Sequence, residues 1–172
     1  MEKENEKKTK KIKSIVILII LLLLILTMIM LIFNQYNSGD LLLSYSYGGG
    51  YGTYGQTMSV NIDVYTNGKI KLTDGEKNIK KQIIVDINDI NELKDLVNNS
   101  VFLNLDSDIS NYDCLDSGFS KITVYLEKNE FKTGGYCISN NIYIEVASKI
   151  KNTVGYDLLS DFREKIIKYY DE

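Results

Sequence analysis

The hydropathy of the chain divides it into one apolar run and a longer region where apolar and polar positions alternate. Residues 15–33 are apolar throughout except for Thr27. A run of this kind predicts a membrane-spanning helix, because nineteen residues at about 1.5 Å each reach roughly 28 Å, close to the thickness of the hydrocarbon core. A cleaved signal peptide is the competing interpretation. It would have an apolar region of about 7–15 residues followed by a small-residue cleavage site, a pattern that this run lacks.

Lysines predict the orientation of this helix. Six lysines precede the apolar run, and the first basic residue after it is Lys69. Because positive charge favours the cytoplasmic side, residues 1–14 are predicted to be a basic cytoplasmic tail. Residues 34–40 are a polar linker, and residues 41–172 form an extracytoplasmic domain. The sequence therefore predicts a single-pass protein of the cell membrane, in contact with the lipid bilayer through residues 15–33.

Apolar residues at every second position predict strands in the first part of this domain. Residues 60–65 show this period, and residues 41–47 are also predicted to form a strand. A three-residue loop after the second strand pairs Val64 with Ile70 and keeps the apolar residues on one face, whereas a two-residue turn would mix the faces. We therefore predict a type I turn with a G1 bulge at Gly68.

A second hairpin and three helices complete the pattern. A turn at residues 128–129 would pair Leu126 with Phe131. A helix with Asp89 as its N-cap is predicted before this hairpin, since apolar residues then recur on one face. Residues 140–154 fit either a strand or a helix, and Gly155 as a terminator favours the helix.

The last predicted helix spans residues 157–170, and its apolar positions are expected to face inward: Leu158, Leu159, Phe162, Ile166 and Tyr169. The order of elements predicts an α+β domain, a small antiparallel sheet with helices on one face.

Composition limits the chemistry. Six of the 20 basic residues and three of the 23 acidic ones precede the apolar run, so the remainder carries 14 against 20, a net charge of −6. An acidic surface disfavours nucleic-acid binding. The chain has no histidine, which excludes catalysis and zinc binding through that residue. The many lysines, asparagines and isoleucines suggest an AT-rich, bacterial coding sequence. We expect no enzymatic activity and no cofactor.

The stretch YSYGGGYGTYG, residues 45–55, is the candidate ligand-binding segment. Glycines allow close approach of another backbone, and tyrosines supply rigid contact area at low entropic cost. The alternative is a glycine-rich hairpin whose tyrosines cover the edge of the sheet. The candidate binding residues are Tyr47, Gly48, Gly49, Gly50, Tyr51 and Tyr54.

A second unusual stretch, residues 104–118, is rich in aspartate. A weak calcium site could use Asp106, Asp108, Asp113 and Asp116, but their spacing does not match the calcium-loop pattern. The same carboxylates leave a hydrolase, such as a glycosidase, as an alternative to a solvated acidic loop.

Cys114 and Cys137 are the only cysteines. An even count outside the cytoplasm favours a disulfide bond, with two unpaired thiols as the alternative. The bond would tie the acidic stretch to the end of the second hairpin.

The order of these features resembles emfourin, a family of small bacterial inhibitors of thermolysin-like metalloproteases. The likeness covers roughly residues 41–154. It rests on a strand that ends at Gly48-Gly49-Gly50, a helix leading into a loop with Phe102, the hairpin of residues 122–131 and a later helix. The resemblance implies protease inhibition, with the glycine loop as the contact region.

The sequence thus favours a membrane-anchored extracytoplasmic binding module that recognises an unidentified protein or glycan. One alternative is an emfourin-like inhibitor displayed at the cell surface, and another is an accessory subunit of a membrane complex. The apolar run has no small-residue repeat for helix pairing, so it gives the second alternative little support.

Overall fold

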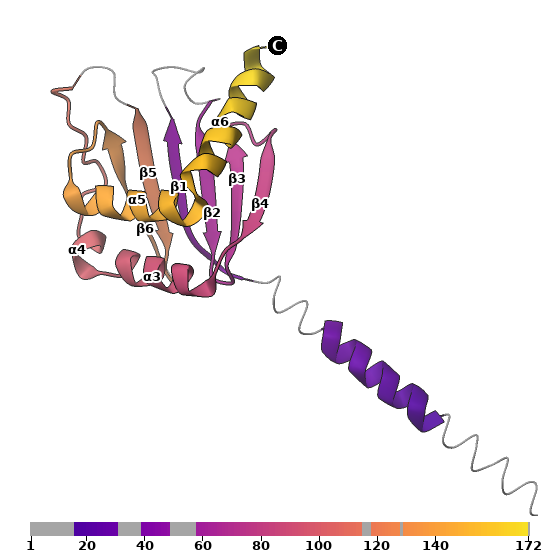
Figure 1. Ribbon diagram of the computed structural model, residues 1–172. Coiled ribbons are helices and arrows are strands. Elements are labelled where there is room, and N and C mark those ends of the chain that lie inside the picture. The colour runs from indigo at the N-terminus through magenta and orange to yellow at the C-terminus, as the bar shows by residue number, and fades with distance from the viewer. Residues whose placement is uncertain (1–15, 31–38, 49–57, 115–117, 128, 172) are drawn as a thin grey trace, which may run out of the picture. The chain divides into compact units, whose positions relative to one another are not determined.

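The computed structural model describes residues 16–30, 39–48, 58–114, 118–127 and 129–171. The chain divides into two units between Ser38 and Gly39. Residues 16–30 are helical, and their apolar side chains are exposed (Figure 1). The other residues of the predicted span, 15 and 31–33, lie outside the described ranges. Within those ranges, the structure contains no helix that combines the length and the apolarity required to cross a membrane.

The second unit is an α+β domain built on one antiparallel sheet of six strands. The order across the sheet is β4-β3-β2-β1-β5-β6, so every neighbouring pair is antiparallel. The strands are β1 (Leu41–Gly48), β2 (Val60–Tyr65), β3 (Lys69–Asp74), β4 (Lys80–Ile84), β5 (Phe119–Tyr125) and β6 (Glu130–Tyr136). The helices are α3 (Ile87–Val97), the short α4 (Ser100–Leu103), α5 (Asn141–Val154) and α6 (Tyr156–Asp171).

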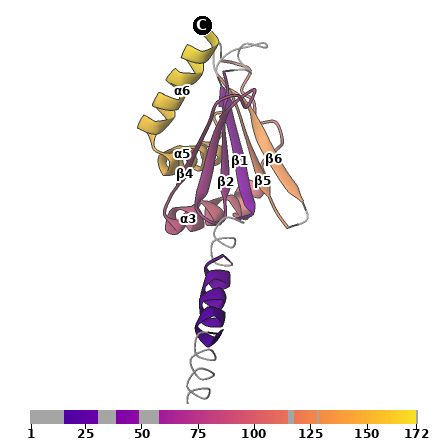
Figure 2. The ribbon, with the colours of Figure 1, turned by 90° about the vertical axis from the view of Figure 1, so that its right-hand side faces the viewer.

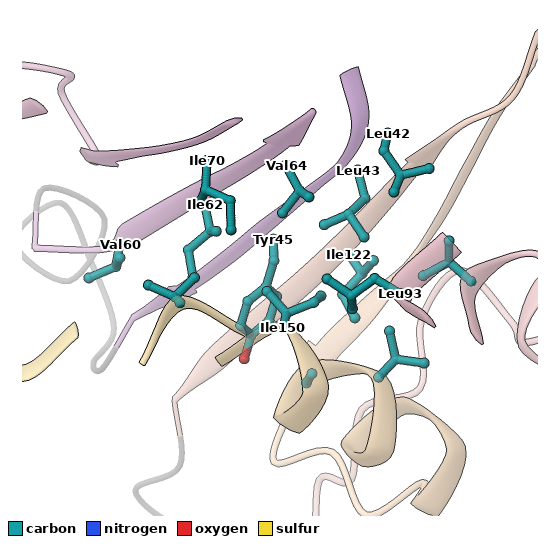
Figure 3. Packing of buried hydrophobic residues seen from close by; sticks show 14 of the residues in the cluster. Leu42, Leu43, Tyr45, Val60, Ile62, Val64, Ile70, Leu93, Ile122 and Ile150 are labelled. Atoms are coloured by element: carbon teal, nitrogen blue, oxygen red, sulfur yellow. The ribbon is translucent and has the colours of Figure 1, made fainter. Parts of the chain in front are cut away.

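The helices lie on one face of this sheet, as the sequence predicts (Figures 1 and 2). We call this side the covered face. Its strand residues are almost fully buried, and Tyr45 and Ile122 point toward Ile150 of α5 (Figure 3). Burial of these apolar side chains is the main stabilising contribution.

The opposite side, which we call the open face, carries the alternate residues of the same strands. Its central positions are Ser44, Ser46, Asn61, Asp63, Lys71, Thr73, Lys121 and Thr123. No described helix packs on it (Figure 2). The period-2 pattern therefore separates an apolar layer from a polar one.

The first hairpin has the predicted register. Val64 lies opposite Ile70, and Gly68 has a φ of +85°. A Cβ at Gly68 would also lie 2.8 Å from the carbonyl oxygen of Val85. Both features require glycine, so the predicted G1 bulge is confirmed.

Two predictions about the middle of the chain were wrong. Phe131 pairs with Val124 rather than with Leu126, whose N–H instead donates to the Asn129 carbonyl at 2.8 Å, so the centre of the turn lies one residue earlier than predicted. The N-cap of α3 is Asp86, whose carboxylate accepts from the Asn88 N–H at 2.8 Å. Because β4, which the sequence analysis missed, ends at Ile84, the chain turns into the helix one turn earlier than expected.

The two C-terminal helices follow the prediction more closely. Residues 141–154 are helical, with Asn140 as N-cap and Gly155 as C-cap. In α6, however, Tyr169 is exposed and Tyr170 turns inward, where its hydroxyl donates to the buried carboxylate of Asp74. The 3.6-residue period explains this difference, since Tyr170 follows Ile166 at a spacing of four.

Candidate recognition surface

Tyr47 and Gly48 are the two candidate binding residues that the structure describes. They end β1, and the Tyr47 ring stacks on that of Tyr45 with centroids 5.2 Å apart. The Lys151 ammonium lies 4.7 Å from the centroid of Tyr47. Part of Tyr47 therefore packs against the domain rather than facing solvent. The other four candidates, Gly49, Gly50, Tyr51 and Tyr54, lie outside the described residues.

A recess of about 260 Å³ lies at this end of β1. Its lining residues are Tyr47, Gly48, Met58, Val60, Gly118 and Arg163. Gly48 and Met58 are the described residues on either side of the range 49–57. Val60 lies directly opposite Tyr47 in the sheet. The recess therefore lies beside the last described residue of the Gly-Tyr stretch and the first described residue that follows it in the chain.

Arg163 supplies the charge of this recess. It is the only arginine of the chain, and it is exposed on α6. Burial raises the pKa of the Tyr47 phenol, and the nearby Arg163 guanidinium partly opposes that shift. Tyr47 is therefore a neutral phenol at physiological pH. Together the two side chains can donate hydrogen bonds to a carboxylate or a carbonyl, and the guanidinium can stack on a flat group.

Sequence reasoning missed Met58 and Arg163 as members of this site. Met58 lies three residues after the end of the Gly-Tyr stretch, and the single arginine among 19 lysines was a compositional signal. Neither fact predicts that α6 lies near the end of β1, because that proximity depends on the packing of the helix against the sheet.

The aspartate-rich stretch has a structural role along the β6 edge of the sheet. The N–H groups of Ile109 and Asn111 donate to the carbonyls of Gly134 and Tyr136, both at 2.9 Å. The stretch thus covers backbone groups that an edge strand would otherwise expose. Gly135 permits the close approach, since a Cβ there would lie 2.4 Å from the hydroxyl of Ser110.

Three of the four candidate calcium ligands, Asp106, Asp108 and Asp113, are described by the structure, and they form no metal-binding group among the described residues. Asp108 accepts hydrogen bonds from the Ser110 hydroxyl and N–H and from the Tyr112 hydroxyl, and these bonds lower the pKa of its carboxyl. Asp106 contributes its backbone carbonyl to Thr133, and Asp116 lies outside the described residues. Among the residues that the structure describes, no group of three or more acidic or cysteine side chains could hold a metal ion.

Cys114 and Cys137 lie at disulfide-bonding distance, with Cα atoms 6.3 Å apart. The predicted pairing is confirmed. It joins the end of the aspartate-rich stretch to the residue that follows β6, and so holds that stretch against the edge of the sheet.

Comparison with known proteins gives no relative for this chain: no family model matches the sequence, and no curated protein does. The emfourin resemblance therefore stays a prediction.

Proposed function

We propose that this chain is a membrane-anchored, extracytoplasmic module that recognises a protein partner through the recess at the end of β1. The anchoring part of the proposal rests on the sequence, on the apolar run of residues 15–33 and on the six lysines that precede it. Protease added to intact source cells should then digest residues 39–172 and leave the N-terminal tail protected. Full protection of the domain until the cells are lysed would contradict this orientation.

One observation carries the recognition part of the proposal: the composition of the recess at the end of β1. Its lining includes Tyr47, Met58 and Arg163. Tyrosine, methionine and arginine are the residue types that protein interfaces concentrate, and tyrosine and arginine dominate their binding energy. Tyr47 and Gly48 also belong to the stretch of residues 45–55, which has the Tyr-Gly composition of antibody loops. A protein partner therefore fits this surface better than a small polar ligand.

Catalysis fits the same recess poorly. Among the described residues, Tyr47 and Arg163 are the titratable ones of its lining, and none of that lining is a carboxylate, a cysteine or a histidine. The described lining therefore supplies no general acid or base that works near neutral pH. Binding is the function that the chemistry of the site favours.

The test is quantitative capture from the surface and secreted fractions of the source cell. The bait is the full chain in detergent micelles, with Arg163→Ala as the variant and Lys165→Ala as the matched control. Both residues are exposed on α6, and Lys165 does not line the recess. We expect the partner to bind the wild type and the control equally. Binding to Arg163→Ala should be weaker by about tenfold or more, the typical effect of losing an interface arginine.

Two results would contradict the proposal: equal affinity of all three baits, or capture of no protein by any of them. Capture of a secreted metalloprotease, lost with Arg163→Ala, would identify the inhibitor activity that the emfourin resemblance implies.

A further inference from the structure

The open face of the sheet carries two recesses that the proposed function does not use. One has a volume of about 320 Å³ and lies beside β6 and the aspartate-rich stretch. The other has a volume of about 500 Å³ and crosses the centre of the sheet. Lys121 lines both of them, so they meet at that residue. Each volume falls in the range of about 300–1,000 Å³ typical of ligand sites.

The recess beside β6 presents aromatic rings to solvent. Phe119 is 39% exposed and makes an edge contact with Tyr136, with centroids 5.5 Å apart. Tyr112 is 77% exposed, and its hydroxyl donates to Asp108 at 3.0 Å. Gly134 contributes no side chain to the lining. The recess therefore offers the partly exposed rings of Phe119 and Tyr112 as contact surfaces for a flat ligand.

The central recess presents hydroxyl, amide and charged groups instead. Its polar lining residues are Ser44, Ser46, Asn61, Asp63, Thr73, Lys77, Lys121, Thr123 and Tyr125. Ser44 donates to Asp63 at 2.6 Å, which leaves the second carboxylate oxygen and the hydroxyl lone pairs as further acceptors. These groups offer donors and acceptors side by side.

Positive and negative charges are equal in number among the described lining residues of the two recesses. Lys77 and Lys121 are positive, and Asp63 and Asp108 are negative. A polyanion such as a nucleic acid needs a cluster of positive charge, which this surface does not have. Among the described residues of the two linings, Leu41 is the one with an aliphatic side chain. A protein partner would bury a more apolar patch at its centre.

We propose that the open face binds an uncharged oligosaccharide. The C–H face of a sugar ring is apolar and can pack on Phe119 and Tyr112, while the sugar hydroxyls need polar partners when they leave water. Lys121, which lines both recesses, and Asp63, which lines the central one, supply such partners. This site lies on the opposite face of the sheet from Tyr47, so it is separate from the protein-recognition recess.

The test measures binding of neutral hexasaccharides to the full chain in micelles of a detergent without a sugar head group. The probes are the hexamers of β-1,4-glucose, β-1,3-glucose, β-1,4-mannose and N-acetylglucosamine, with sulfated heparin as a polyanion. We expect at least one neutral hexamer to bind in isothermal titration calorimetry. The double variant Tyr112→Ala, Phe119→Ala should weaken that binding about tenfold or more, because it removes both aromatic platforms.

The matched control is Tyr156→Ala, which removes an exposed tyrosine from α6 and should leave the affinity unchanged. Arg163→Ala should also bind the hexamer normally, so failure of this site and failure of the protein-recognition recess are distinguishable. The proposal is overturned if none of the neutral hexamers binds, or if the double variant binds as well as the wild type. Binding of heparin alone, abolished by high salt, would also overturn it.

Discussion

The two faces of the sheet are built from alternate residues of the same strands, yet they differ in nearly every physical property. On the covered face, Tyr45 lies opposite Ile62 and Ile122, and all three are 2% exposed or less. One position away, Ser44 lies opposite Asp63 and Thr123. The first row is held by apolar burial, whereas in the second row the half-buried Ser44 donates a hydrogen bond to the half-buried Asp63. A two-residue period thus places the apolar core on one face and polar side chains on the other.

The largest expected difference between the two faces is in the loss of stability when one phenylalanine on each face is replaced by alanine. Phe162 of α6 is 1% exposed against the covered face, and Phe119 is 39% exposed on the open face. Phe162→Ala should lower the free energy of unfolding by about 3–5 kcal/mol, since it leaves a cavity in the core. Phe119→Ala should cost about 1 kcal/mol or less, through the edge contact with Tyr136. Urea unfolding followed by circular dichroism measures both, and equal costs would refute the distinction.

The second expected effect concerns the border of the open face, where the disulfide bond holds the aspartate-rich stretch. Replacing Cys114 and Cys137 together by serine should lower the free energy of unfolding by about 3 kcal/mol, because the 23-residue separation is no longer closed in the unfolded chain. Amide exchange should speed up at Ile109 and Asn111 more than in α5. Reduction of the wild type provides the control, and a cost below about 0.5 kcal/mol would show that the bond is not stabilising.

The smallest expected effect is the pH dependence of a tyrosine that packs on the covered face. Burial raises the pKa of the Tyr143 phenol from 10.0 to about 12, and its hydroxyl donates to Ser120 at 3.0 Å. Because the folded-state pKa is the higher one, the neutral phenol stabilises the fold fully below pH 10. That contribution is lost as the pH rises from 10 to 12.

Tyr143→Phe removes this titration. At pH 8 the variant should be about 1 kcal/mol less stable than the wild type, since it loses the hydrogen bond to Ser120. Near pH 11.5 the difference in stability should shrink or reverse. At that pH the buried phenol of the wild type resists ionisation and destabilises the fold, whereas the variant has no group to ionise there. Urea titrations at the two pH values measure this change, and parallel stability curves would contradict it.

Local pattern was enough to predict most of the core elements. The pairing of Val64 with Ile70 followed from parity, because a shift of one residue would have exposed the apolar face. The end of α5 followed from Gly155. In both cases the deciding interaction lies within a few residues of the chain.

Prediction failed where no residue is strongly buried. In β4, the residues KKQII alternate between exposed and half-buried, so neither periodicity nor a buried apolar side chain marks this edge strand. The recess at Arg163 and the two open-face recesses that share Lys121 were not predicted, for a related reason. Each combines residues far apart in sequence, and their chemistry becomes visible only after the strands are placed side by side.

The sequence alone determined the α+β class, the alternation of the strands, the first hairpin and the cysteine pair, because each depends on local periodicity, turn chemistry or a count of residues. The tertiary structure decided the strand order, the role of the aspartate-rich stretch as a cover for β6, and the position of Arg163 beside Tyr47. Those features depend on contacts between segments distant in the chain. Such contacts are selected by the burial of the whole core and not by any one stretch of sequence.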